Sequence, residues 1–99
     1  MHGASEVPVQ TAEAARLVLD LAVEAAEIMN VTVLGDVAVA AHVALAAARS
    51  GADQADLNLS TLGDEAFVSS LRSRLKRALE GGDSIVEKTV ATVRRRAAA

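Results

Sequence analysis

The 99-residue sequence contains no cysteine, tryptophan or tyrosine, and it has one phenylalanine, Phe67, and one proline, Pro8. The absence of cysteine excludes disulfides, thiolate zinc sites and cysteine nucleophiles. Two histidines without any cysteine also argue against a structural metal, so we expect no metal ion. The single aromatic residue leaves no stacking platform of the kind that single-strand nucleic-acid binders use.

The hydrophobic residues that are present are small. They make up 52% of the chain, and we count 22 Ala, 13 Val and 11 Leu. Such side chains suit closely packed helices, whereas a sandwich or barrel needs aromatic and β-branched strands. We therefore predict an all-α fold, and a chain of this length forms at most one unit, residues 1–99.

The net charge of -3 hides an asymmetry along the chain. Residues 1–68 carry ten acidic and two basic side chains, which gives -8, and residues 69–99 carry three acidic and eight basic ones, which gives +5. The basic end could bind nucleic acid, but packing of oppositely charged helices explains the same pattern. We favour the helix packing and expect no nucleic-acid partner.

Residues 1–6 lack the basic region that opens a signal peptide. The longest apolar run, residues 37–48, is interrupted by His42 and is too short to cross a bilayer. We therefore expect a cytoplasmic protein with no membrane partner.

An amphipathic helix is predicted over residues 11–29, beginning near Pro8, because the missing N–H of proline is not needed in a first turn. Its apolar positions recur at spacings of three and four, and most charged side chains fall opposite them. We expect the buried face to consist of Ala14, Ala15, Val18, Leu21, Ala22, Ala25, Ile28 and Met29.

A second helix is predicted from Asp36 to about Ser50, closed by Gly51 and preceded by a short break at residues 30–35. Residues 37–48 have almost no polar face, and a helix that is apolar all round must be buried all round. Three other short helices can hardly enclose it. We therefore expect a compact bundle with a central buried helix, completed by oligomerisation.

A third helix is predicted over residues 62–80, after an extended segment at residues 57–59. Thr61 and Asp64 have the spacing of a capping box at its start. Its apolar stripe has spacings of four and consists of Phe67, Leu71, Leu75 and Leu79.

Gly81 and Gly82 end or hinge the third helix, and a fourth begins at Asp83 or Ser84. We expect residues 94–99 to fray. The predicted bundle thus has about four helices.

Four segments carry a further pattern: Ser-Glu-Val-Pro-Val at residues 5–9, Glu-Ile-Met-Asn at residues 27–30, Gly-Asp-Val-Ala-Val-Ala-Ala at residues 35–41, and Leu-Asn-Leu-Ser-Thr-Leu-Gly-Asp-Glu-Ala-Phe at residues 57–67. In order and spacing, these segments resemble the cyclodeaminase/cyclohydrolase family. This is the folate-handling domain at the carboxyl end of formiminotransferase-cyclodeaminase, found also as free methenyltetrahydrofolate cyclohydrolases. The resemblance covers nearly the whole chain but only the later half of a family domain about twice as long.

The resemblance implies one-carbon chemistry on a tetrahydrofolate derivative, which is a substrate and not a cofactor. Either ammonia leaves as a formimino group cyclises, or water attacks the cationic methenyl bridge. Both reactions pass through a tetrahedral carbon between two nitrogens, so a carboxylate or similar group must move a proton and stabilise positive charge.

The half length implies that this chain works as part of an assembly, with itself or with a separately encoded amino-terminal half. The alternative is a non-catalytic helical module, derived from the same family and kept for oligomerisation or interaction.

Asp36 and Asp64 are the candidate catalytic residues, because each opens a predicted helix and Asp36 matches the family's most recognisable acidic position. N-capping and the helix dipole explain an aspartate at either place equally well. Asn30, Asn58 and His42 are the candidate substrate-binding residues. The two amides could pair with pterin edges or satisfy loose backbone groups, and a lone histidine in an apolar helix is more often a core or interface residue.

Overall fold

In a computed structural model that describes residues 2–99, the chain forms four α-helices and a short 3₁₀ turn. The elements are α1 (His2–Ile28), η1 (Val31–Val33), α2 (Leu34–Leu59), α3 (Glu65–Leu79) and α4 (Gly82–Ala98). No strand occurs within residues 2–99. The prediction of an all-α bundle of about four helices is confirmed.

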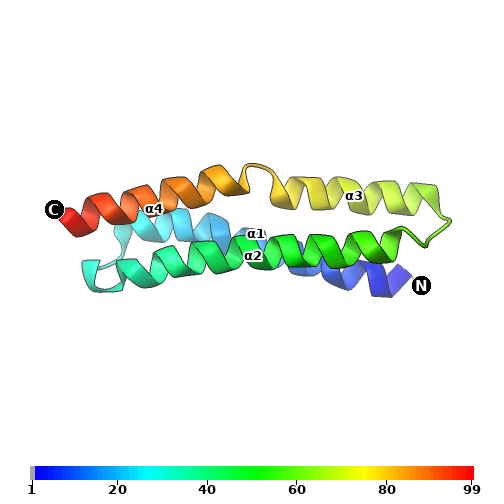
Figure 1. The fold of residues 1–99 in the computed structure, drawn as a ribbon, viewed down its shortest axis with the longest axis horizontal. Helices are drawn as coiled ribbons and strands as arrows, with labels where there is room; N and C mark the ends of the chain where they lie inside the picture. Colours follow the sequence, from blue (N-terminus) through cyan, green and yellow to red (C-terminus); the bar gives the residue numbers. More distant parts are fainter. Residues whose placement is uncertain (1) are drawn as a thin grey trace.

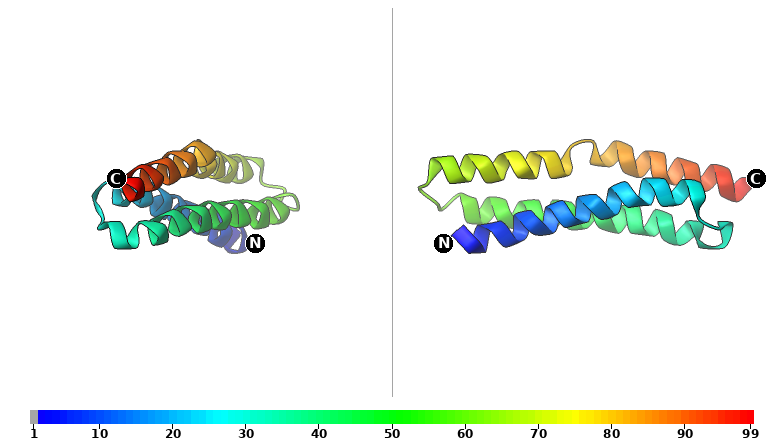
Figure 2. Two further views of the ribbon diagram at one scale, coloured as in Figure 1. Left: turned by 60° about the vertical axis from the view of Figure 1, so that its left-hand side comes forward. Right: turned by 180° about the vertical axis from the view of Figure 1, so that it is seen from behind.

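The molecule is elongated, measuring 55 × 18 × 16 Å, and consists of a long hairpin covered along one side. Helices α1 and α2 run antiparallel along its length, and α3 and α4 follow each other end to end against them (Figure 1). The two further views show α3 over the half that holds the start of α1 and α4 over the half that holds the α1–α2 turn (Figure 2). No helix in the described part of the chain lies on the opposite side of the hairpin.

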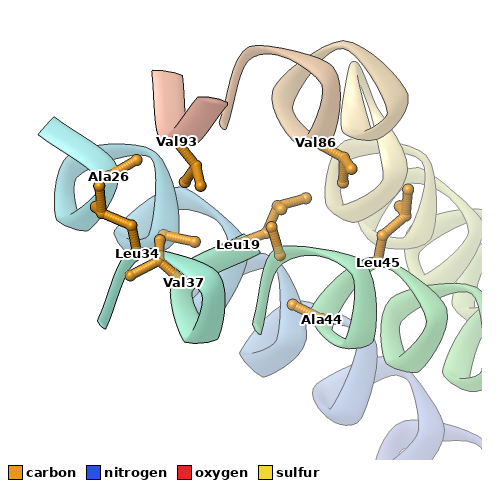
Figure 3. Close-up of a cluster of buried hydrophobic side chains, with 10 residues drawn as sticks. Leu19, Ala26, Leu34, Val37, Ala44, Leu45, Val86 and Val93 are labelled. Carbon is orange, nitrogen blue, oxygen red and sulfur yellow. The ribbon is translucent and has the colours of Figure 1, made fainter. Parts of the chain in front are cut away.

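Two clusters of buried side chains form the core. One lies between the α1–α2 hairpin and α4, and the other lies between the hairpin and α3. The cluster under α4 joins three helices and includes Leu19, Ala26, Leu34, Val37, Ala44, Leu45, Val86 and Val93 (Figure 3). The cluster under α3 includes Val9, Ala12, Ala55, Leu59, Leu71 and Leu75. Alanine is frequent at the α1–α2 contact, so the two backbones can approach closely.

The first helix begins at His2, well before the predicted start, and Pro8 lies inside it. A proline within a helix removes one N–H donor and leaves the carbonyl four residues earlier without its usual partner. That carbonyl, on Ala4, accepts a hydrogen bond from the Asn58 side chain of α2. A tertiary contact therefore allows α1 to continue through Pro8.

The predicted buried face of α1 is only partly correct. Ala15 and Ala22 are buried, as are Leu19 and Ala26, which the prediction did not include. The larger side chains of the predicted face are exposed: Val18, Leu21, Ile28 and Met29. Two apolar stripes thus run along α1, and the one that packs consists mostly of alanine, together with Val9 and Leu19.

The second helix does not end at Gly51 but continues to Leu59, so the expected extended segment at residues 57–59 is helical. Gly51 is buried where α2 crosses α1, and a Cβ there would lie 2.7 Å from the Pro8 carbonyl oxygen. The glycine serves close helix packing and not chain termination. Within this single chain the helix is not buried all round, because Val39 and Val43 are about 60% exposed.

The third helix begins at Glu65, and Asp64 is its N-cap, with Oδ1 accepting from the Phe67 N–H at 3.1 Å. Thr61 is not the cap, since its hydroxyl donates to the Asn58 carbonyl at 2.9 Å. The predicted stripe is confirmed by the burial of Leu71 and Leu75.

The break between α3 and α4 is a turn at Gly81, which adopts φ 70°, a left-handed conformation that favours glycine. The fourth helix begins at Gly82 and continues to Ala98, so the expected fraying from residue 94 is not observed. The Arg96 guanidinium donates to the Ala26 carbonyl at 2.8 Å, which ties the end of α4 to α1.

A charged pair links α1 to α3. Arg74 donates to both carboxylate oxygens of Glu13, at 2.6 and 3.0 Å. These hydrogen bonds hold the pKa of Glu13 below its usual value, against the opposing effect of burial. The contribution of this pair to the free energy of unfolding is therefore fully present at pH values above the ordinary glutamate pKa. It is lost as the pH falls through the lowered pKa of Glu13.

One helical segment, Val31–Leu59, is long and apolar enough to cross a membrane by length and composition alone. We expected the longest apolar run to be too short to cross a bilayer. That expectation considered only residues 37–48, whereas the helix is longer. The core helix of a soluble protein passes the same test, and α1, α3 and α4 cover two sides of α2. The expectation of no membrane partner stays a prediction.

Candidate functional site at the α1–α2 turn

Asn30 lies at the turn between α1 and α2 and caps the short η1 segment. Its Oδ1 accepts hydrogen bonds from the Thr32 N–H and the Thr32 hydroxyl, both at 3.0 Å. This contact explains why the chain breaks at Asn30, since an asparagine side chain can replace the backbone as an acceptor. The Asn30 amide nitrogen donates to no group within residues 2–99, so it can still donate to a ligand.

Asp36 lies in the first turn of α2, six residues after Asn30, and is exposed. The residue that precedes this helix as its N-cap is Val33, which has no capping side chain. A carboxylate in a first turn is stabilised by the backbone N–H groups and the helix dipole. Asp36 has no ion pair within residues 2–99, so its carboxylate is available to a cationic substrate.

Asn58 lies in helix α2 near its carboxyl end, not in a non-helical break. Its Nδ2 donates to the Ala4 carbonyl at 3.0 Å, which is the carbonyl that Pro8 leaves without a backbone donor. A structural role therefore accounts for the amide nitrogen of Asn58.

We expect Asn58→Ala to lower the free energy of unfolding by about 1 kcal/mol, because it removes the donor to a carbonyl that has no helical partner. In the double variant Pro8→Ala/Asn58→Ala the backbone N–H of residue 8 replaces that donor, so the loss should be smaller than the sum of the single changes. Urea unfolding of the four proteins measures this coupling. Strict additivity would show that the two residues act independently.

Asp64 and His42 lie apart from the α1–α2 turn. Asp64 caps α3, near the start of α1 at the other end of the molecule. His42 is on an exposed part of α2, where it lines a shallow depression of about 280 Å³ together with Glu87 and Arg94 of α4. No group of three or more His, Cys, Asp or Glu side chains with a metal-binding arrangement occurs among the described residues.

Asn30 and Asp36 both lie at the α1–α2 turn, and the other candidates lie elsewhere in the fold. Asp36 and Asn58 are 22 residues apart on one helix, which corresponds to about 33 Å at 1.5 Å per residue. One chain therefore presents two polar ends, one with Asn30 and Asp36 and the other with Asn58 and Asp64.

Sequence reasoning missed a set of residues on the uncovered side of the hairpin, which we term the open face. Its α1 positions alternate in spacing between four and three: Val7, Thr11, Ala14, Val18, Leu21, Ala25 and Ile28. Its α2 positions have the same spacing: Asp36, Ala40, Val43, Ala47, Ser50, Gln54 and Leu57. The regular 3–4 spacing was the available signal, and all fourteen residues are exposed or half-buried.

A shallow groove of about 410 Å³ lies between the helices on this side, lined by Val7, Pro8, Thr11, Ala47, Ser50, Gly51 and Gln54. Asp36 is the one charged residue of the open face and lies at its turn end. The candidate catalytic carboxylate therefore borders an uncovered apolar surface.

Comparison with known proteins finds one family. The family model described as formiminotransferase-cyclodeaminase matches residues 1–77, a stretch that contains Asn30, Asp36, His42, Asn58 and Asp64. The resemblance inferred from the four sequence segments is confirmed. No curated protein and no solved structure matches the chain.

Proposed function

We propose that this chain, which belongs to the formiminotransferase-cyclodeaminase family, is a subunit of an assembled enzyme of folate one-carbon metabolism. Its reaction is that of a formimidoyltetrahydrofolate cyclodeaminase or a methenyltetrahydrofolate cyclohydrolase. The observation that carries the proposal is the family match across residues 1–77, which includes every candidate site residue.

The geometry of the α1–α2 turn supports this function. An exposed carboxylate on Asp36 can balance the positive charge of a methenyl bridge or accept a proton as the tetrahedral carbon forms or collapses. The amide of Asn30, whose oxygen is already bonded to Thr32, can donate to a carbonyl or ring nitrogen of the pterin.

The separation of the polar ends favours the need for assembly. Asp64 and Asn58 cannot reach a substrate held at Asp36 of the same chain, so catalysis would require a second polypeptide at the turn. A non-catalytic interaction module remains the second candidate, because one chain alone has only two of the candidate site residues, Asn30 and Asp36, at the α1–α2 turn.

We expect the assembled protein to hydrolyse methenyltetrahydrofolate or to release ammonia from the formimino form. Asp36→Asn should lower the rate by about 100-fold or more with an unchanged melting curve, because asparagine keeps the shape but cannot take a proton. The measurement is the loss of methenyl absorbance and the release of ammonia. Asp83→Asn is the matched control, since Asp83 is an exposed aspartate of α4 paired with Arg49.

The outcomes separate the proposals. An assembly with neither activity nor affinity for folate would refute the enzyme function, and the non-catalytic interaction module would then be the favoured candidate. An active assembly in which Asp36→Asn keeps the full rate would preserve the function but refute the assignment of Asp36.

A further inference from the structure

The open face carries large apolar side chains that no described residue covers. Leu21, Val43, Leu57 and Ile28 are 62, 60, 69 and 79% exposed. Exposed apolar surface that continues over many residues marks a binding surface in a folded protein. The positions also repeat with spacings of three and four in both helices, which is the pattern of side chains that interdigitate with another helix.

We propose that a second copy of this chain docks on the open face with its helices antiparallel to the first. Each Asn30–Asp36 turn is then completed by Gln54 of the partner subunit. The dimer is independent of the proposed function, and only the use of the completed site for folate rests on it.

The size of the open face fits a stable dimer. The molecule is 55 Å long and 18 Å wide, so this side has a footprint of about 1,000 Å² per copy. Specific interfaces bury about 800 Å² per partner. Most of the face is apolar, and small residues such as Ala14, Ala40 and Ala47 let the facing helices approach closely.

The register within the hairpin determines how two copies can match. Gly51 of α2 lies against Pro8 and Ala12 of α1. Because the helices are antiparallel, Arg16 and Leu45 are then at the same level. In the proposed dimer the two-fold axis crosses the hairpin at that level, perpendicular to both helices. Helix α1 then lies over α1 of the partner subunit, and α2 lies over its α2. The open-face positions that come level with each other are Val7 and Ala25, Thr11 and Leu21, Ala14 and Val18, Asp36 and Gln54, Ala40 and Ser50, and Val43 and Ala47.

Asp36 selects the antiparallel orientation. In the other two-fold arrangement, with parallel copies, the axis runs along the hairpin and α2 lies over α1 of the partner subunit, so Asp36 would come level with an apolar position, Ala25 of the partner subunit, where a desolvated carboxylate without a donor is costly. In the antiparallel dimer each Asp36 lies level with Gln54 of the partner subunit, whose amide can donate a hydrogen bond.

Charge also favours a second copy over a lipid surface. Helices that lie on membranes carry lysine and arginine beside their apolar face, which attract anionic lipids. Here α1 and α2 carry eight acidic and two basic side chains. Within residues 2–99, the two basic side chains, Arg16 and Arg49, are both paired toward α3 and α4.

The first test is sedimentation of the purified chain at micromolar concentrations, where we expect a dimer. Val43→Glu should raise the dimer dissociation constant by about 100-fold or more, because it places an unpaired charge in the interface. Ala91→Glu is the control, since Ala91 is exposed on α4, which lies on the opposite side of the hairpin from the open face. It should have a much smaller effect.

The second test uses the absence of native cysteine. Ala40→Cys and Ser50→Cys are prepared as separate proteins and oxidised alone and as a mixture. The antiparallel dimer predicts a disulfide only in the mixture, because identical positions are about 15 Å apart along the helix. The result remains informative even if Val43→Glu fails to fold.

Three results would overturn the proposal. One is a folded monomer at all concentrations, as expected if a different polypeptide covers the face. Another is disulfide formation in each single-cysteine protein alone, which the antiparallel register excludes. The third is a monomer that binds vesicles of phosphatidylcholine and phosphatidylglycerol, which would identify the face as a membrane-binding surface.

Discussion

Replacement of Gly51 by valine is expected to lower the free energy of unfolding by about 3 kcal/mol. A Cβ at this position would lie 2.7 Å from the Pro8 carbonyl oxygen, 3.0 Å from the Ala12 nitrogen and 3.3 Å from the Ala12 Cβ. Two of these atoms belong to the backbone of α1 and cannot turn aside as a side chain would. The two longest helices must therefore separate where their small residues now pack.

Gly51→Ala should give an intermediate loss of about 1–2 kcal/mol, because overpacking outweighs the gain of about 0.4–1 kcal/mol that alanine brings to a helix. Gly35→Ala is the control: it is also helical, and nothing lies within 4 Å of its added Cβ, so it should raise stability. Thermal unfolding at one fixed protein concentration measures the series, with about 4–8 °C expected per kcal/mol. A rise in melting temperature for Gly51→Ala would contradict the close crossing.

The sequence predicted the fold class and the packing stripe of α3, but not where α1 and α2 begin and end. The prediction took Pro8 as the start of one helix and Gly51 as the end of the next, which is the usual local role of proline and glycine. The structure instead pairs each with the other helix: Asn58 supplies the donor that Pro8 lacks, and Gly51 provides the space that α1 needs. Contacts between residues about 50 positions apart are not visible in local patterns.

The buried face of α1 was misassigned for a related reason. The helix carries two apolar stripes that both have spacings of three and four, and the prediction assigned Val18 and Leu21 to the core. The structure buries Ala12 and Ala26 instead. Where two backbones approach closely, small residues are the ones that fit, and the large residues are left for another surface.

The candidate site was predictable only where it is local. Asn30 and Asp36 are six residues apart, so a short turn must keep them near each other. Asp64 and Asn58 were grouped with them on chemical type alone, and the length of α2 separates them within one chain. That separation follows from the bounds of α2, which continues to Leu59 and not only to Ser50.

The break between α3 and α4 depends on a single arginine, and Arg16→Ala is expected to lower the free energy of unfolding by about 2 kcal/mol. Its Nη1 donates to the carbonyl oxygens of Arg77, Ala78 and Glu80 at 3.3, 3.1 and 2.6 Å. The last carbonyls of a helix have no partner within it, and a cation there is also favoured by the dipole. Loss of the guanidinium should raise hydrogen exchange at the amides around Gly81 before the rest of the chain opens.

Two variants separate this role from the surface charge of Arg16. Asp20→Ala removes the Asp20 partner of Nε, an exposed pair, and should change stability by less than about 1 kcal/mol. Arg16→Lys keeps the charge but loses the planar donors, so we expect it to recover only part of the stability. If Arg16→Ala and Asp20→Ala have equal effects and exchange near Gly81 is unchanged, the arginine acts through its ion pair and not by capping α3.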